Sequence, residues 1–283
     1  GDNSVIVGAY AMSPNTTGQN NTAVGRNALT ANIDGANNVA VGCGALAANT
    51  TVSDNTAIGF LAMRATTTGA TNTAIGANSM AENTTGCLNT VVGVSALQCN
   101  TEGCQNIAMG LQAMRFNQTG DFNVALGREA LCTNTTANNN TAVGFKALCA
   151  NTTANDNTAV GFCSLKSNTT GTQNVAMGAY ALDANTTASQ NVAIGFDALS
   201  ISTTGTANVA IGFEAARNTT TSSNNTAIGF CALRINSTGT SLTAVGHSSL
   251  ASNTTANDNT AIGRLSLFSN TTGASNTGLV EVL

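Results

Sequence analysis

Apolar and polar positions follow one another in this chain with a fixed period of 17 residues. One copy of the pattern is N-T-A-V-G-F-K-A-L-C-A-N-T-T-A-N-D at residues 140–156, and its glycine, Gly144, recurs from Gly8 to Gly263 without an insertion. We number each copy from this glycine as position zero. Position −2 is nearly always Ala, −1 is Val, Ile, Leu or Met, +3 is Ala or Ser, and +4 is Leu or Met in all copies but one. Such a period predicts a solenoid, in which each copy is one coil that buries its apolar side by stacking.

The residue types within one copy predict β-structure. The β-branched run at −3 to −1 is typical of a short strand, and the Ala-Leu step at +3 and +4 predicts a second one. Asn, Thr and Gly are poor helix formers. The glycine at zero and the small residue at +10 are turn positions, where a side chain is costly or φ is positive. We therefore predict an all-β, parallel β-solenoid (β-roll) of about 17 coils, on the order of 80 Å long at a coil spacing of ~4.8 Å.

The repeat array takes up almost the whole chain. Residues 1–275 are predicted to form 16 complete or near-complete coils, and residues 276–283 a partial terminal coil in which Val280 replaces the glycine. The pattern is cut at both ends and no signal peptide opens the chain, so we expect a piece of a longer protein. No stretch approaches the roughly 20 apolar residues of a membrane span, so membrane insertion is not expected.

The charged residues indicate which columns are covered. All nine Lys and Arg lie at +1, +2 or +5, whereas −4 to zero, +3 and +4 carry no charge in any copy. Columns that never accept a charge are expected to be covered, because a buried unpaired charge is costly. Successive side chains of a strand point to opposite faces, so both faces of the strand before the glycine are predicted to be covered. One face would fill the coil and the other would pack against another chain, which predicts a parallel homotrimer.

Three columns are predicted to build the core of each coil. Leucine at +4 should be buried, glycine at zero should form the turn, and asparagine at −4 should hydrogen-bond to the coils above and below as an amide ladder. A second Asn column lies at +7 in 13 of 16 copies. In the middle of the chain, this predicted structural ladder comprises Asn140, Asn157, Asn174, Gly144, Gly161, Gly178, Leu148, Leu165 and Leu182.

Two further sets of side chains share columns. Phenylalanines at +1 occur in runs, which predicts an aromatic ladder or, as the alternative, a contact surface formed by Phe196, Phe213 and Phe230. Cys87 and Cys104 share +11, and Cys132 and Cys149 share +5. Coils ~4.8 Å apart lie within the Cα range of a disulfide. Both pairs are therefore possible disulfides, and stacked free thiols are the alternative.

Composition and motifs speak against most chemical functions. The net charge of −4 argues against nucleic acid and anionic membranes as partners. The glycines lack the spacing of phosphate-binding loops, and no Cys or His cluster has metal spacing, so we expect neither cofactor nor metal. His247 has no recurring acid or nucleophile beside it, and single Asp residues at +12 lack the ligand density of calcium repeats. Strict repetition leaves no unique polar cluster, so we do not expect an enzyme.

The repeats resemble those of known fibrous proteins. N-V-A-I-G at residues 191–195 and 208–212, each followed by a small residue at +3, resembles the head repeats of YadA-type trimeric autotransporter adhesins. The longer phrase at residues 55–69, N-T-A-I-G-F-L-A-M-R-A-T-T-T-G, also resembles Asn- and Thr-rich repeats of phage tail-fibre and bacterial surface proteins. Adhesin heads repeat at a shorter period, so this chain would need a longer loop. The resemblance spans the whole chain and implies a left-handed β-roll, three chains side by side, and an extracellular structural or adhesive role.

Two functions of different classes are consistent with these features. The first is a fibre shaft on a virion or cell surface, which spaces or presents receptor-binding elements toward a glycan or protein receptor of the host. The alternative is ice binding, because Thr fills +8 in 13 copies and +9 in 14 of 16, and regular Thr arrays on a flat face can order water. Adjacent Thr side chains of an extended segment point opposite ways, which favours the shaft.

Overall fold

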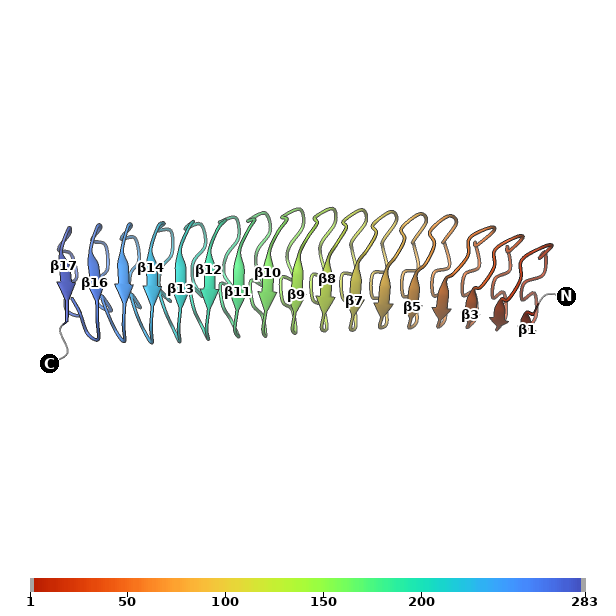
Figure 1. Ribbon diagram of the computed structural model, residues 1–283, viewed down its shortest axis with the longest axis horizontal. Helices are drawn as coiled ribbons and strands as arrows, with labels where there is room; N and C mark the ends of the chain where they lie inside the picture. Colours follow the sequence, from red (N-terminus) through yellow and green to blue (C-terminus); the bar gives the residue numbers. More distant parts are fainter. Residues whose placement is uncertain (1–2, 281–283) are drawn as a thin grey trace. The chain divides into compact units, whose positions relative to one another are not determined.

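A computed structural model describes residues 3–280 of the chain. The chain divides into two compact units, residues 1–140 and residues 141–283, which are taken separately below. Each unit is a parallel β-solenoid in which one three-residue strand recurs every 17 residues (Figure 1). The described residues contain no helix. The predicted all-β parallel solenoid and its 17-residue repeat are therefore confirmed, while the left-handed coil and the trimer stay predictions. Residues 281–283 of the predicted partial coil lie outside the described part.

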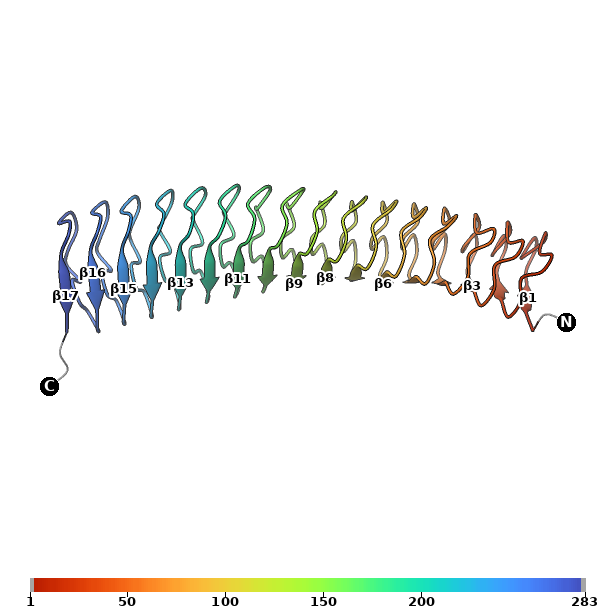
Figure 2. The same cartoon turned by 45° about the horizontal axis from the view of Figure 1, so that its top comes forward.

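The strands within each unit stack in parallel and in register (Figure 2). Paired residues lie one period apart, as Ala159 and Ala176 do. The strands of the first unit are β1 Val5–Val7, β2 Thr22–Val24, β3 Val39–Val41, β4 Thr56–Ile58, β5 Thr73–Ile75, β6 Thr90–Val92, β7 Ile107–Met109 and β8 Val124–Leu126. Those of the second unit are β9 Thr141–Val143, β10 Thr158–Val160, β11 Val175–Met177, β12 Val192–Ile194, β13 Val209–Ile211, β14 Thr226–Ile228, β15 Thr243–Val245, β16 Thr260–Ile262 and β17 Thr277–Leu279.

Each strand from β2 to β8 in the first unit and from β9 to β16 in the second has one buried inward side chain between two outward ones. In β10, Ala159 is fully buried, whereas Thr158 and Val160 on either side are half-buried. The small inward Ala lets the coil close tightly, and the β-branched neighbours suit the pleated surface. Charge is thus excluded at −2 because this position faces the core. At −3 and −1 charge is also absent, yet these side chains remain partly exposed in the single chain.

The prediction of a second strand at +3 and +4 is wrong. Residues of this segment form turns, and Leu148 and Leu165 at +4 have φ of 53° and 50°. Positions +3 and +4 are both buried in the middle of the array, as Ala147 and Leu148 show. An extended strand would send two successive side chains to opposite faces, so it could not bury both inside one thin coil. The left-handed backbone at +4 turns both side chains into the core.

The two small-residue columns have different physical causes. At position zero, Gly161 and Gly178 have φ of 139° and 133°, where side chains are rarely tolerated. A Cβ on Gly161 would also lie 2.5 Å from the carbonyl oxygen of Gly178 in the next coil. The glycines at +10 do not have this positive φ. There, a Cβ on Gly86 would lie 2.5 Å from the carbonyl oxygen of Gly103, so lack of space restricts the column to small residues.

The buried asparagines at −4 link the coils through side chain and backbone. Asn174 is fully buried; its Oδ1 accepts the backbone N–H of Asn191 in the next coil at 3.0 Å, and its Nδ2 donates to the carbonyl of Ala188 at 2.9 Å. Asn157 accepts from Asn174 in the same way at 2.9 Å. Asn140 donates its own N–H to Oδ1 of Asn123 at 2.9 Å. The expected ladder therefore exists, but its principal links run from side chain to backbone.

The asparagines at +7 form the amide-to-amide ladder. Nδ2 of Asn185 donates to Oδ1 of Asn168 in the preceding coil at 2.7 Å. The same Nδ2 donates to the carbonyl of Ala188 at 3.0 Å. The carbonyl at +10 can thus accept hydrogen bonds from the asparagines at −4 and +7 of its own coil, which holds the turn at +10 beside the start of the strand. Each of these polar groups is buried and needs the partner that the stack supplies.

Candidate interaction surfaces

The outward face of the strands carries no charge; it is apolar at −1 and has Thr, Val or Ile at −3. We call positions −3 and −1 of all coils the strand face. At −1, Ile58 in the first unit remains 37% exposed, and Met177 and Ile262 in the second are 42% and 45% exposed. Directly after the glycine, the +1 column adds exposed apolar side chains such as Phe60 and Val94. Monomeric soluble proteins rarely expose extended apolar patches, so this face is a candidate for contact with another molecule.

The aromatic ladder predicted at +1 is present in the second unit. Rings of Phe196 and Phe213 stack with centroids 5.5 Å apart, and Phe213 stacks on Phe230 at 5.2 Å with an angle of 8° between the planes. Phe145 and Phe162 form a further stacked pair at 5.2 Å. Stacking covers the ring faces and leaves mostly ring edges toward solvent, which limits the ladder as a platform for flat ligands.

Two aromatic residues were not foreseen as members of this ladder. Tyr180 lies at +2, yet its ring contacts Phe162 at 5.4 Å and Phe196 at 6.1 Å in edge-to-face geometry. It bridges the coil whose +1 residue is Ala179. His247 at +1 stacks on Phe230 at 5.2 Å. Its place in the Phe column was the signal that could have identified His247 as a stacking partner rather than an isolated surface histidine.

The two threonine columns differ in exposure and bonding. At +8, Thr169 is half-buried, and its Oγ1 donates to the carbonyl of Thr186 in the next coil at 3.0 Å. Thr186 repeats this bond to Thr203 at 3.3 Å. At +9, Thr170 and Thr187 are exposed. The hydroxyls at +8 are therefore engaged within the stack, and the exposed column is the one at +9.

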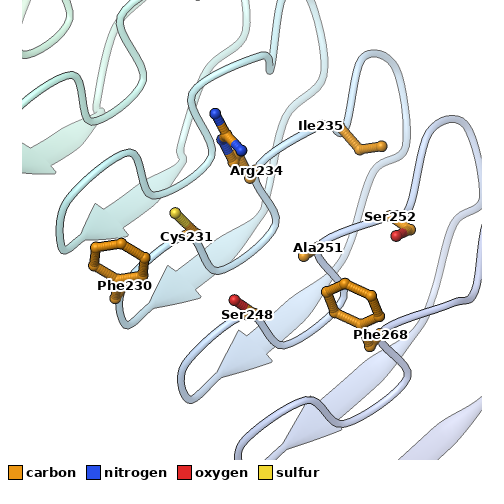
Figure 3. A pocket seen from close by; sticks show the side chains of 8 residues that line it. All are labelled: Phe230, Cys231, Arg234, Ile235, Ser248, Ala251, Ser252 and Phe268. Atoms are coloured by element: carbon orange, nitrogen blue, oxygen red, sulfur yellow. The ribbon is translucent and has the colours of Figure 1, made fainter.

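Side chains at +2 and +5 form ion pairs between coils, and positions +2, +5 and +6 also border a surface depression. Nε of Arg234 lies 2.7 Å from Oε2 of Glu214 in the preceding coil. The depression has a volume of about 370 Å³ and forms where one coil has the small residues Ser248, Ala251 and Ser252 at +2, +5 and +6. Phe230 and Phe268 lie at opposite ends of it (Figure 3). Its lining combines the two aromatic rings and two serine hydroxyls with the thiol of Cys231 and the guanidinium of Arg234.

The two predicted cysteine pairs differ in location: one lies within the first unit, and the other has one cysteine in each unit. Sγ of Cys87 and Sγ of Cys104, both in the first unit, are 2.7 Å apart. Burial, followed by the hydrogen bond with Cys87, raises the pKa of the Cys104 thiol to about 11. Cys132 is buried in the first unit and Cys149 is half-buried in the second. A disulfide between Cys132 and Cys149 stays a prediction.

Within residues 3–280, no three His, Cys, Asp or Glu residues come together in a group that could hold a metal ion. No helix among these described residues has the length and apolar character of a membrane span. The chain matches no known protein-family model and is not similar in sequence to the curated proteins. The resemblance of its repeats to adhesin and fibre repeats therefore stays a prediction.

Proposed function

We propose that this chain is part of the shaft of an extracellular fibre, built from three parallel copies and spacing receptor-binding elements away from a virion or cell. The observation that carries the proposal is the strand face, where no copy has a charged residue and apolar side chains such as Ile228 remain partly exposed. A face of this kind is typical of a surface that another protein chain covers.

A second copy of the same chain is the partner that suits this face best. Position −1 is apolar in every coil, so parallel copies in the same register bring apolar columns together at every level of the stack. A closed arrangement of identical chains buries these columns without leaving a growing edge. The uniform period also allows the contact to lengthen by one coil at a time, which suits a spacer.

The rest of the surface supports a structural role. The coils repeat one backbone and one core from end to end of each unit, which suits a structural element. Recognition of a host glycan or protein would fall to elements outside the array, or to the variable columns that include Phe196 and Tyr180. The extracellular location is part of this proposal and rests on the resemblance of the repeats.

The oligomeric state in solution tests the proposal. The wild-type chain should be a trimer at micromolar concentration by multi-angle light scattering. Changing Ile194, Ile211 and Ile228 together to Lys places like charges at the end of β12, β13 and β14. These side chains are only partly buried in the single chain, so circular dichroism should still show the folded solenoid, while the mass should fall to that of a monomer.

A matched variant separates assembly from general charge effects. Thr204, Thr221 and Thr238 lie at +9 of the same three coils and are exposed, and their change to Lys should leave the trimer intact. A monomeric wild-type chain would contradict the proposal. A trimer that persists in the isoleucine variant would show that the strand face is not the contact.

Ice binding is the second candidate. Its support is the register of the solenoid, which repeats Thr170 and Thr187 at +9 as an exposed column. Against it, the hydroxyls of Thr169 and Thr186 at +8 donate hydrogen bonds to backbone carbonyls of the next coil. A surface that orders water needs free hydroxyls at regular spacing, and only one of the two columns offers them.

A further inference from the structure

We propose that Cys87 and Cys104 form a thiol–disulfide exchange site, at which an external small-molecule disulfide is reduced and a disulfide between two successive coils is formed. The two sulfur atoms lie 2.7 Å apart in the first unit. Both side chains are half-buried, so the pair is held by the fold and remains within reach of a solute. The proposal is independent of the fibre function.

The backbone bonding of the +11 column explains why the sulfur atoms meet. In other coils a side-chain oxygen at +11 accepts the backbone N–H of the +11 residue in the preceding coil: Ser53 accepts from Ala36 at 3.0 Å, Ser189 from Thr172 at 3.0 Å and Ser223 from Thr206 at 2.9 Å. Sγ of Cys104 takes this place and accepts the N–H of Cys87 at 3.0 Å. The same contact that holds a serine hydroxyl elsewhere therefore holds this sulfur beside Cys87.

The next coil fixes the second cysteine. The backbone N–H of Cys104 donates to Oδ1 of Asp121 at 2.6 Å, which continues the +11 column with a carboxylate instead of a sulfur. Sγ of Cys104 also lies 3.4 Å from the carbonyl of Glu102. Cys104 is thus held from both sides of its coil, and burial raises the pKa of its thiol.

The exchange balances with oxidised glutathione as the oxidant. The thiolate of Cys87 attacks one glutathione sulfur, the S–S bond of glutathione breaks, and one glutathione thiolate leaves. Cys104 then gives its proton to solvent, attacks the Cys87 sulfur of the mixed disulfide and displaces the second glutathione thiolate. Two electrons pass from the two cysteines to glutathione, and two protons end on the released thiols. The product is one protein disulfide that joins the coils of Gly76 and Gly93.

Peptide mapping of the folded full chain tests the exchange. The reduced protein is incubated with oxidised glutathione at neutral pH, the remaining thiols are blocked, and endoproteinase Glu-C digestion follows without reduction. Cleavage after Glu82 and Glu102 places Cys87 on peptide 83–102 and Cys104 on peptide 103–129. The expected product is these two peptides joined by a disulfide, with two of their three thiols lost and no glutathione attached to either peptide. Fragmentation of the joined peptides distinguishes Cys87 from Cys99.

Two variants complete the design. Cys104→Ser is a matched control because serine already fills +11 at Ser53, Ser189 and Ser223; it should keep the circular dichroism spectrum and accumulate glutathione on Cys87. Cys99→Ser should leave the joined peptides unchanged. The proposal is overturned if wild-type Cys87 and Cys104 stay reduced, if glutathione remains on Cys87 in the wild-type chain, or if the bond runs through Cys99.

Discussion

At the scale of single residues, the free energy gained by burying a leucine side chain exceeds the cost of an unfavourable backbone conformation. Leu148 and Leu165 adopt a left-handed backbone that favours Gly, Asn and Asp. The left-handed conformation costs roughly 1–2 kcal/mol for an ordinary residue, whereas full burial of a leucine contributes about 1.5–3 kcal/mol. The sequence pattern was enough to predict that +4 is buried. It could not predict the conformation there, since only residues such as Asp156 and Asp258 at +12, with φ of 62° and 57°, carry the usual left-handed signal.

Replacing a −4 asparagine by leucine should destabilise the stack through lost hydrogen bonds alone. Leu242 already occupies this column and is almost fully buried, so the volume is tolerated. Asn174→Leu leaves the N–H of Asn191 without its acceptor, and an unsatisfied buried donor costs about 1–3 kcal/mol. Denaturant unfolding should show this loss, whereas Thr170→Ala at an exposed position should change stability by less than ~0.5 kcal/mol. Equal stability of Asn174→Leu and wild type would refute the role of the ladder.

Replacing a partly buried carboxyl by an amide should stabilise the fold, and this stabilisation should depend on pH. Burial, and next the nearby Asp197, raise the pKa of Asp183 above its usual range. The folded chain then holds this proton more tightly than the unfolded chain, so stability falls as pH rises through the folded pKa. Asp183→Asn should therefore raise the Tm at pH 7, and the gain should vanish below about pH 4. The exposed Asp258→Asn controls for removal of one negative charge. A gain of the same size at every pH would contradict this cause.

At the scale of elements, the strand and the turn differ in how well the sequence predicted them. The strand before the glycine was predicted because Thr158, Ala159 and Val160 combine β-branched residues with alternating size. The segment at +3 and +4 was misassigned, because Ala-Leu is compatible with a strand, a turn or a helix. Only the geometry of a thin coil, which must bury both side chains, distinguishes these possibilities.

A carboxylate in place of a buried leucine should destabilise the fold far more than a carboxylate at an exposed position of the same coil. Leu165→Asp places a carboxylate where the side chain is fully buried, which costs several kcal/mol unless the coils separate. Thr170→Asp adds the same charge at exposed +9, where Asp34 and Glu102 occur naturally, and should change stability by less than ~0.5 kcal/mol. Thermal unfolding followed by circular dichroism measures both. Similar losses in the two variants would mean that the inward and outward columns are misassigned.

At the scale of the whole molecule, each unit presents the same few columns over and over. The strand face, the aromatic ladder and the threonine columns at +8 and +9 were all visible in the sequence, because stacking places residues that recur every 17 positions in a line on the surface. Features that occur in one coil only could not be recognised from the columns of the sequence. The depression at Ser248, Ala251 and Ser252 is such a feature, because it arises from a local change of side-chain size. The neighbourhood of Cys87 and Cys104, by contrast, was expected from their shared +11 column, and their sulfur atoms lie 2.7 Å apart.

Cooling the chain in water distinguishes the two candidate functions. We expect no thermal hysteresis and no faceted ice at micromolar concentration, because Thr152, Thr169 and Thr186 donate their hydroxyls to carbonyls in the next coil and leave a single exposed threonine column. Ice shaping by the wild-type chain would count against the shaft. It would establish the exposed column as the active surface if Thr170→Tyr and Thr187→Tyr together abolish it while the solenoid stays folded. A fibre shaft requires a trimer that does not shape ice, because the partner chains then cover the strand face and a single exposed threonine column at +9 is too narrow to order an ice-like layer of water.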